Sequence, residues 1–133
     1  TPSAFAPFEL KKLADARHRI GVLEAKYPRQ PGPLVLRCEL LMRQGDAAGA
    51  RRSCEAAIDR WDEAAYAYYL LGVLAEASRD RALATASFSR TIALDPTNED
   101  AWRRLAALYR GANEGPALDA LKVRFARQFN RAL

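Results

Sequence analysis

Small and apolar residues recur every three or four positions along most of the chain, which is the spacing of one face of an α-helix. The pattern is clearest from Ala65 to Asn98, where two short amphipathic segments stand back to back and end at Pro96. The first segment turns Tyr68, Leu71, Gly72 and Ala75 inward, and the second turns Ala84, Phe88, Thr91 and Ile92 inward. Such narrow stripes stabilise a helix only through tertiary packing, so we expect neighbours of the same kind.

The same periodicity predicts five more helices. They cover residues 8–27, 33–43, 47–60, 99–110 and 116–130. Prolines and glycines separate them, and Asp46 and Asp62 are placed to cap the helices that follow. Residues 1–7 hold two prolines and predict an extended lead-in. Ala, Leu and Arg are abundant while β-branched residues are few, so seven helices in an all-α fold are expected.

The inward positions repeat at an interval of 34 residues. Leu34, Tyr68 and Trp102 share this spacing, as do Ala16, Ala50 and Ala84, and Ile20, Cys54 and Phe88. A fixed period of this length predicts a stack of helix-turn-helix units rather than a fold with one central core.

The repeat resembles the tetratricopeptide repeat. Residues 65–98 carry the residue types typical of that family at its characteristic positions: Tyr68, Leu71, Gly72, Ala84, Phe88 and Pro96. Residues 31–64 match less fully, since Arg37 stands where Leu is usual and Asp62 where Pro is usual. Residues 99–133 match in their first helix, with the second helix shifted by one residue. The matching residues there are Trp102, Leu105, Ala106 and Tyr109. Residues 1–30 form an N-terminal entry and helix, of which residues 11–30 resemble the second half of a fourth unit through Ala16, Ile20 and Pro28. The resemblance implies a single domain over residues 1–133, built as a right-handed superhelix (α-solenoid) of antiparallel helix pairs.

Charge and hydropathy restrict the possible partners. The formal net charge is +5, and residues 1–30 carry six basic against three acidic side chains. No aromatic residues alternate with the basic ones, so we expect a protein or peptide partner with acidic groups and not a nucleic acid.

No apolar run is long enough to cross a membrane, so we expect no membrane insertion. The compartment, cytoplasmic or periplasmic, stays open. The chain begins without Met, which suggests a processed precursor or part of a longer chain.

Catalytic and metal chemistry have no visible residues to support them. His18 is the only histidine and lies between two arginines, so we interpret it as a surface side chain. No metal-ligand spacing, phosphate-binding loop or nucleophile motif is present, and we expect no cofactor and no enzyme activity. Cys38 and Cys54 fall at facing inward positions of one hairpin. A disulfide is possible there, but we favour two free thiols packed as small core residues.

A binding groove is the remaining candidate site, because in this protein family the first helix of each repeat lines a concave face. The residues expected to line it are Val35, Glu39, Met42, Arg43, Tyr66, Tyr69, Val73, Glu76, Arg103, Arg104, Ala107 and Arg110. Tyr66 and Tyr69 are the strongest evidence, since they share a face and the inward stripe does not require them. Tyr and Arg are also residue types that anchor interfaces.

One known ligand of this family fits poorly. Repeats that hold the carboxy-terminal tail of heat-shock chaperones use Lys and Asn from the first helix, Asn from the second, and Lys and Arg from the third. The matching places here hold Val35, Glu39, Leu70, Asp100 and Arg104, of which only Arg104 agrees. We therefore do not expect that ligand.

The sequence as a whole favours a non-enzymatic interaction module that binds a peptide segment or partner domain. The alternative is a structural segment of a larger repeat protein that self-associates or stacks on further repeats, as the half-repeat at the start and Phe125 and Phe129 near the end suggest. Anion or nucleic-acid binding by the basic ends ranks third, and would weaken steeply with salt.

Overall fold

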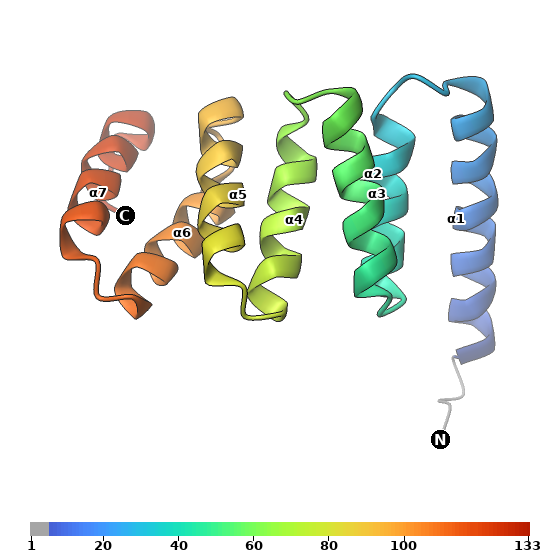
Figure 1. Ribbon diagram of the computed structural model, residues 1–133, viewed down its shortest axis with the longest axis horizontal. Coiled ribbons are helices and arrows are strands. Elements are labelled where there is room, and N and C mark those ends of the chain that lie inside the picture. The colour runs from blue at the N-terminus through green and yellow to red at the C-terminus, as the bar shows by residue number, and fades with distance from the viewer. Residues whose placement is uncertain (1–5) are drawn as a thin grey trace. The chain divides into compact units, whose positions relative to one another are not determined.

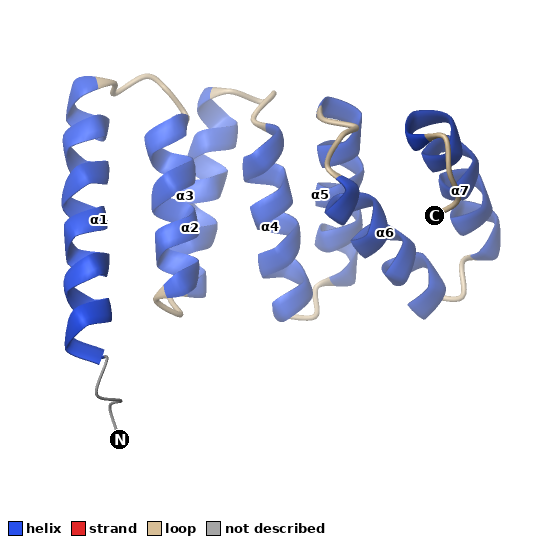
Figure 2. Cartoon of the chain, turned by 180° about the vertical axis from the view of Figure 1, so that it is seen from behind, coloured by secondary structure: helices blue, strands red, loops and turns tan. Residues whose placement is uncertain are grey.

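The described part of the chain, residues 6–133 of a computed structural model, consists of helices joined by short turns (Figures 1 and 2). The helices are α1 (Ala6–Lys26), α2 (Gly32–Arg43), α3 (Ala47–Arg60), α4 (Ala65–Ala77), α5 (Arg81–Leu94), α6 (Glu99–Gly111) and α7 (Gly115–Phe129). The predictions of an all-α fold and of seven helices are confirmed over these residues. None of these helices has the length and apolar character that spanning a bilayer requires.

The beginning of α1 differs from the prediction. The helix starts at Ala6, so residues 6 and 7 are helical and do not continue the expected extended lead-in. Pro7 fits there because an amide in the first turn of a helix has no intrahelical acceptor to lose. The rest of the predicted lead-in, residues 1–5, lies outside the described residues.

The chain divides into two compact units, the first ending at Ala67 and the second beginning at Tyr68. The first unit contains α1, α2, α3 and the first turn of α4, and the second contains the remainder of α4 and α5–α7. Successive helices pack in antiparallel pairs, as in tetratricopeptide repeats. The single domain and its superhelical shape remain predictions.

The first unit is held together around the α2–α3 pair, with α1 packed on α2. Small residues of α3, Ala50 and Ala57, are fully buried and allow the helices to approach closely. A second small cluster joins Ala57 to Ala64 and Ala67, with Val35 packed partly against it.

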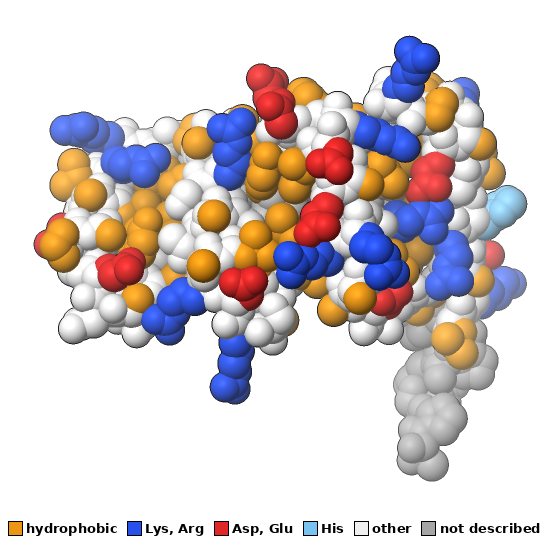
Figure 3. Space-filling view, in the orientation of Figure 1, with side chains coloured by type: hydrophobic (Ala, Val, Ile, Leu, Met, Phe, Trp, Pro, Cys, Tyr) orange, Lys and Arg blue, Asp and Glu red, His pale blue; other side chains and the backbone are white. Residues whose placement is uncertain are grey.

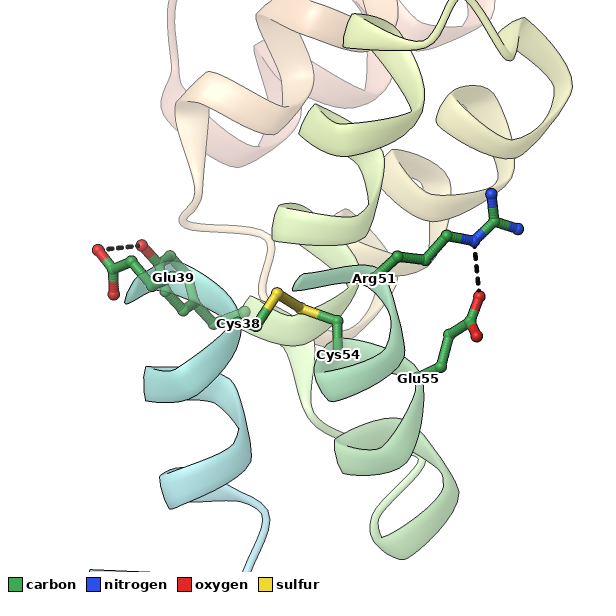
Figure 4. Close-up of a disulfide and its surroundings, with 6 residues drawn as sticks. Cys38, Glu39, Arg51, Cys54 and Glu55 are labelled. Atoms are coloured by element: carbon green, nitrogen blue, oxygen red, sulfur yellow. Dashed lines mark hydrogen bonds and ion pairs between the residues drawn. A yellow bond between two sulfur atoms is a disulfide. The ribbon is translucent and has the colours of Figure 1, made fainter. Parts of the chain in front are cut away.

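A disulfide between Cys38 and Cys54 links α2 to α3 (Figure 4). The two Cα atoms are 5.5 Å apart and both side chains are fully buried. Our preference for two free thiols was therefore wrong. We expected small residues at these positions only because they allow α2 and α3 to pack closely. The same close approach of the two helices brings the cysteine Cα atoms within the distance that a disulfide requires.

The second unit has a larger, aromatic core. Phe88 and Phe125 are fully buried, and Trp102 is 2% exposed. Trp102 lies edge-on to Phe125, with ring centroids 5.7 Å apart, which is a favourable aromatic geometry. Its indole nitrogen donates a hydrogen bond of 2.9 Å to the carbonyl of Pro96, so the one polar atom of this buried ring is satisfied.

The turn inside each helix pair repeats with the sequence period. Gly45, Arg79 and Asn113 all have positive φ, between 57° and 79°. Each donates its amide to a carbonyl three residues back, and the next residue bonds five residues back, so the same left-handed ending closes α2, α4 and α6. The period thus fixes backbone conformation as well as core positions.

The residue after each of these turns caps the following helix in two of the three pairs. Asp46 accepts a hydrogen bond from the Gly49 amide at 2.9 Å, and Asp80 accepts one from Leu83 at 3.1 Å. The prediction for Asp46 is confirmed. The prediction for Asp62 is wrong. Since α4 begins at Ala65, its N-cap residue is Ala64, whose side chain has no oxygen to accept a hydrogen bond.

Candidate functional site

The predicted binding residues come from α2, α4 and α6, and fall in both units. Those in the first unit are Val35, Glu39, Met42, Arg43 and Tyr66. Those in the second are Tyr69, Val73, Glu76, Arg103, Arg104, Ala107 and Arg110. Each group is described within its own unit.

In the first unit, Glu39 is the shared acceptor of two neighbours. Its Oε1 accepts a long hydrogen bond of 3.4 Å from the Tyr66 hydroxyl and lies 3.6 Å from Nη2 of Arg43. Burial and the negative charge of Glu39 raise the pKa of Tyr66 above its ordinary value. Tyr66 is nevertheless 46% exposed, so part of the residue remains accessible to a partner. Glu39 adjoins the disulfide cysteine Cys38 on α2 (Figure 4).

In the second unit, four of the predicted or neighbouring side chains form one network between α4 and α6. The Tyr69 hydroxyl donates to Oδ2 of Asp100. Arg104 donates from Nε to the same oxygen at 2.6 Å and from Nη1 to Oε1 of Glu76 at 3.1 Å. Its guanidinium also lies 5.9 Å from the centre of the Tyr69 ring. Arg104 therefore ties α6 to α4.

The electrostatics of this network keep its ionisation fixed at neutral pH. Hydrogen bonds from Tyr69 and Arg104 lower the pKa of Asp100 below its ordinary value, so the carboxylate stays charged. The bond from Arg104 to Asp100 raises the pKa of the guanidinium. Burial and the bond to Asp100 raise the pKa of Tyr69, so the phenol stays neutral.

Two of the expected groove residues are partly structural. Tyr69 and Val73 pack against the core of the second unit, and the Tyr69 ring centroid is 6.0 Å from that of Phe88. The premise that the inward stripe does not need Tyr69 is therefore wrong. Sequence periodicity missed this because Tyr69 stands beside the stripe, not on it, and its ring is long enough to reach Phe88 from there.

The exposed remainder in the second unit is a strip on α6, which we call the α6 strip: Arg103, Ala107 and Arg110. All three are exposed, and their spacing of four and three residues places them on one helix face. Arg103 donates a 2.8 Å hydrogen bond to Glu99, yet 62% of its side chain is accessible. The side chain of Arg110 makes no ion pair or hydrogen bond with any other residue that the structure describes, although its backbone carbonyl accepts a bond from Asn113.

The sequence analysis did not single out Glu99, whose carboxylate binds Arg103 on one oxygen and Arg131 on the other. The only available signal was the i,i+4 spacing of Glu99 and Arg103. Arg131 follows the end of α7 and its contact is tertiary, so no local pattern predicts it.

The structure also places the five residues that match the chaperone-tail positions. Leu70 is 4% exposed and so offers no surface to a ligand. Asp100 holds a negative charge inside the network, at the position where a lysine would be needed to bind the chaperone tail.

The described residues contain no cluster of metal ligands. In the part of the chain from residue 6 onward, no three His, Cys, Asp or Glu side chains gather in a way that suits a metal ion.

Comparisons with known proteins rest on structure alone. No protein-family model matches the sequence, and no curated protein is significantly similar to it. The first tetratricopeptide repeat domain of Spaghetti (RPAP3), solved with the HSP90 peptide SRMEEVD, is similar with a TM-score of 0.72 and 21% identity, over 80% of this chain and 86% of that one. MamA is similar with a TM-score of 0.73 and 19% identity, over 96% of this chain and 75% of that one.

Proposed function

We propose, on the premise that this chain has the tetratricopeptide-repeat fold, that it is a non-enzymatic module that binds a peptide segment or partner domain. The α6 strip is the principal contact in the second unit, and Tyr66 with Glu39 and Arg43 is the accessible surface in the first. The partner carries acidic groups.

The observation that supports this most directly is the state of Arg110 and Arg103. The Arg110 side chain makes no ion pair with another described residue, so all its donors are available to a carboxylate, whereas Arg103 uses one nitrogen on Glu99 and keeps its other donors. Planar guanidinium groups bind carboxylates through two parallel hydrogen bonds. The exposed Ala107 between them leaves room for a partner backbone to approach the helix. Arg104 is not part of this proposal, because Asp100 and Glu76 already engage two of its nitrogen atoms.

The ligand of the RPAP3 domain illustrates the class of partner and also a difference. That domain was solved with SRMEEVD, a peptide with three acidic side chains. In this chain Asp100 and the buried Leu70 replace the residues that would hold a peptide carboxy-terminus. We therefore propose that acidic side chains within a peptide, and not its terminal carboxylate, are bound by Arg103 and Arg110.

The experiment is a peptide array of random dodecamers probed with the wild-type chain and with the double variant Arg103→Glu, Arg110→Glu. Wild type should bind sequences enriched in Asp and Glu, and the double variant should lose them. The control is Lys122→Glu, Arg127→Glu on α7, which changes net charge equally at exposed positions. Equal losses in both variants, or no enrichment of acidic sequences, would reject the α6 strip as the binding surface.

The same preparations test the alternative of an assembly segment. Light scattering over a concentration range should show a monomer for wild type and both variants. Association that rises with concentration, together with a blank array, would favour the structural role.

A further inference from the structure

An open groove of about 560 Å³ lies between α1 and α2, within the first unit. Its apolar lining is made by Ala16, Ile20 and Leu23 of α1 and by Leu36 and Leu40 of α2. Leu36 is 45% exposed although it adjoins this apolar surface. Leu36 is continuous with the four other apolar side chains of the lining, and a contiguous accessible apolar surface is a candidate binding site.

The repeat itself shows what kind of element fits the groove. Positions two periods apart differ by twice the 34-residue repeat. On this spacing, Ala16 and Ile20 of α1 correspond to Ala84 and Phe88 of α5. Leu36 and Leu40 of α2 correspond to Arg104 and Leu108 of α6. The groove between α1 and α2 is thus the counterpart of the surface that α5 and α6 share in the second unit.

In the second unit, that surface is occupied by α4. Gly72 of α4 lies against the ring of Phe88, and Glu76 of α4 receives the hydrogen bond from Arg104. Tyr69 of α4 packs on Phe88 as well. The positions that line the groove at α1 and α2 are therefore positions that hold a helix elsewhere in the same molecule.

We infer that the groove between α1 and α2 is a docking seat for an amphipathic, acidic α-helix of a partner protein, which lies there as α4 lies on α5 and α6. The apolar face of that helix covers Leu36 and Ile20. Because Ile20 replaces the much larger Phe88, the seat accepts a medium-sized apolar side chain where α4 has Gly72.

Charge around the groove selects an acidic helix. The residues that line the groove include three basic side chains against two acidic ones. Arg19 and Arg43 stand on its two sides, and Lys12 near one end. The acidic side chains at the rim are Asp15 and Glu39, and Glu39 already faces Arg43 and Tyr66. Figure 3 shows Lys and Arg side chains over α1 and the helices beside it, with Asp and Glu side chains between them.

This seat shares Glu39 and Arg43 with the first-unit surface in the proposed function, but it has no residue in common with the α6 strip. Leu36 and Arg19 belong to the groove alone, and Arg103 and Arg110 belong to the α6 strip alone. Variants of these four residues therefore distinguish failure of the seat from failure of the α6 strip.

The experiment measures binding of two fluorescein-labelled synthetic peptides by fluorescence anisotropy. Both are 13 residues long, the length of α4, and carry the same leucine and alanine stripe at helical spacing. One has Glu at its flanking positions and the other has Lys. The acidic peptide should bind at least about tenfold more tightly than the basic one, since complementary charge sets partner choice.

Two variants assign the site. Leu36→Asp should weaken the acidic peptide by about tenfold or more, because it places a charge in the apolar contact. Arg19→Glu changes an exposed residue without touching the apolar lining, and should reduce the preference for the acidic peptide. The matched control is Val22→Asp, 53% exposed on α1 and not part of the groove, which should leave binding unchanged.

Circular dichroism of each variant verifies that the helices are retained. Failure of both peptides to bind, equal loss in Leu36→Asp and Val22→Asp, or loss only in the Arg103→Glu, Arg110→Glu variant would each overturn the seat. A dimer of the unliganded chain that Leu36→Asp dissociates would also overturn it, because a second copy would then be the occupant.

Discussion

Gly72 of α4 lies so close to Phe88 of α5 that a β-carbon built on it would stand 2.6 Å from Cε1 of the ring. One period earlier, the corresponding positions are Cys38 and Cys54, which form the disulfide. The same close approach between two helices is thus filled by an aromatic ring against a bare backbone in one unit and by a covalent bond in the other.

Replacing Gly72 with Ala should destabilise the second unit by about 1–3 kcal/mol, because the methyl group overpacks a fully buried ring. Urea unfolding measures the change. The control is Gly21→Ala, inside α1, where a β-carbon meets nothing within 4 Å and better helix propensity should stabilise by about 0.5–1 kcal/mol. A neutral Gly72→Ala would mean that Phe88 can move aside.

Reducing the Cys38–Cys54 disulfide should destabilise the first unit by about 3 kcal/mol, the loop-closure value for a cross-link of this sequence separation, 16 residues. Thermal unfolding with and without reductant measures it, and the Cys38→Ala, Cys54→Ala double variant should be insensitive to reductant. Thiol titration of the unfolded, unreduced chain should find no free thiol. Two thiols there would show that the bond is absent.

Arg79→Gly should stabilise the chain by about 0.5–1 kcal/mol. Arg79 has a φ of 60°, a left-handed conformation that costs a residue with a β-carbon but not glycine, and this relief exceeds the entropy that glycine adds to the unfolded state. Gly45→Ala, at the same place one period earlier with a φ of 79°, should instead destabilise the chain. If both substitutions changed the free energy of unfolding in the same direction, the two turns would not share the left-handed conformation.

Tyr69→Phe should raise the pKa of Asp100, because the hydroxyl bond from Tyr69 is the largest cause of its depression. Carbon-13 NMR of the Asp100 carboxyl group measures the shift. The folded pKa lies below the ordinary value of 3.8, so the ionised carboxylate stabilises the folded state above that pH, and the stabilisation is lost as pH falls below it. Tyr69→Phe should weaken this acid dependence, whereas Tyr27→Phe, far along the sequence in the other unit, should not alter it.

Much of the fold follows from local patterns. The helices between residues 32 and 129 begin and end close to the predicted residues, because Gly45, Pro96 and Asp46 act through local backbone geometry. The 34-residue period also identified buried side chains such as Cys54, Ala84 and Phe88, but it did not predict the burial of Leu40 and Leu70. These signals lie within one or two helical turns, where spacing alone decides the outcome.

The candidate site was less predictable, because its contacts join different helices. The contact of Arg131 with Glu99 and the binding of Arg104 by both Asp100 and Glu76 depend on how helices pack, and helical spacing gives no sign of them. Tyr69 appeared to be surplus to the core for the same reason. The disulfide was mispredicted as two free thiols because small residues and bonded cysteines fit the same facing positions.

Trp102 gives the molecule an internal reporter of one unit. It is buried edge-on to Phe125 in the second unit, whereas the other tryptophan, Trp61, is 51% exposed in the first. Intrinsic fluorescence therefore follows the melting of the second unit, and the reactivity of Cys38 and Cys54 under reductant follows that of the first. Unfolding midpoints from the two signals, recorded on one unlabelled sample, measure how strongly the repeats depend on each other.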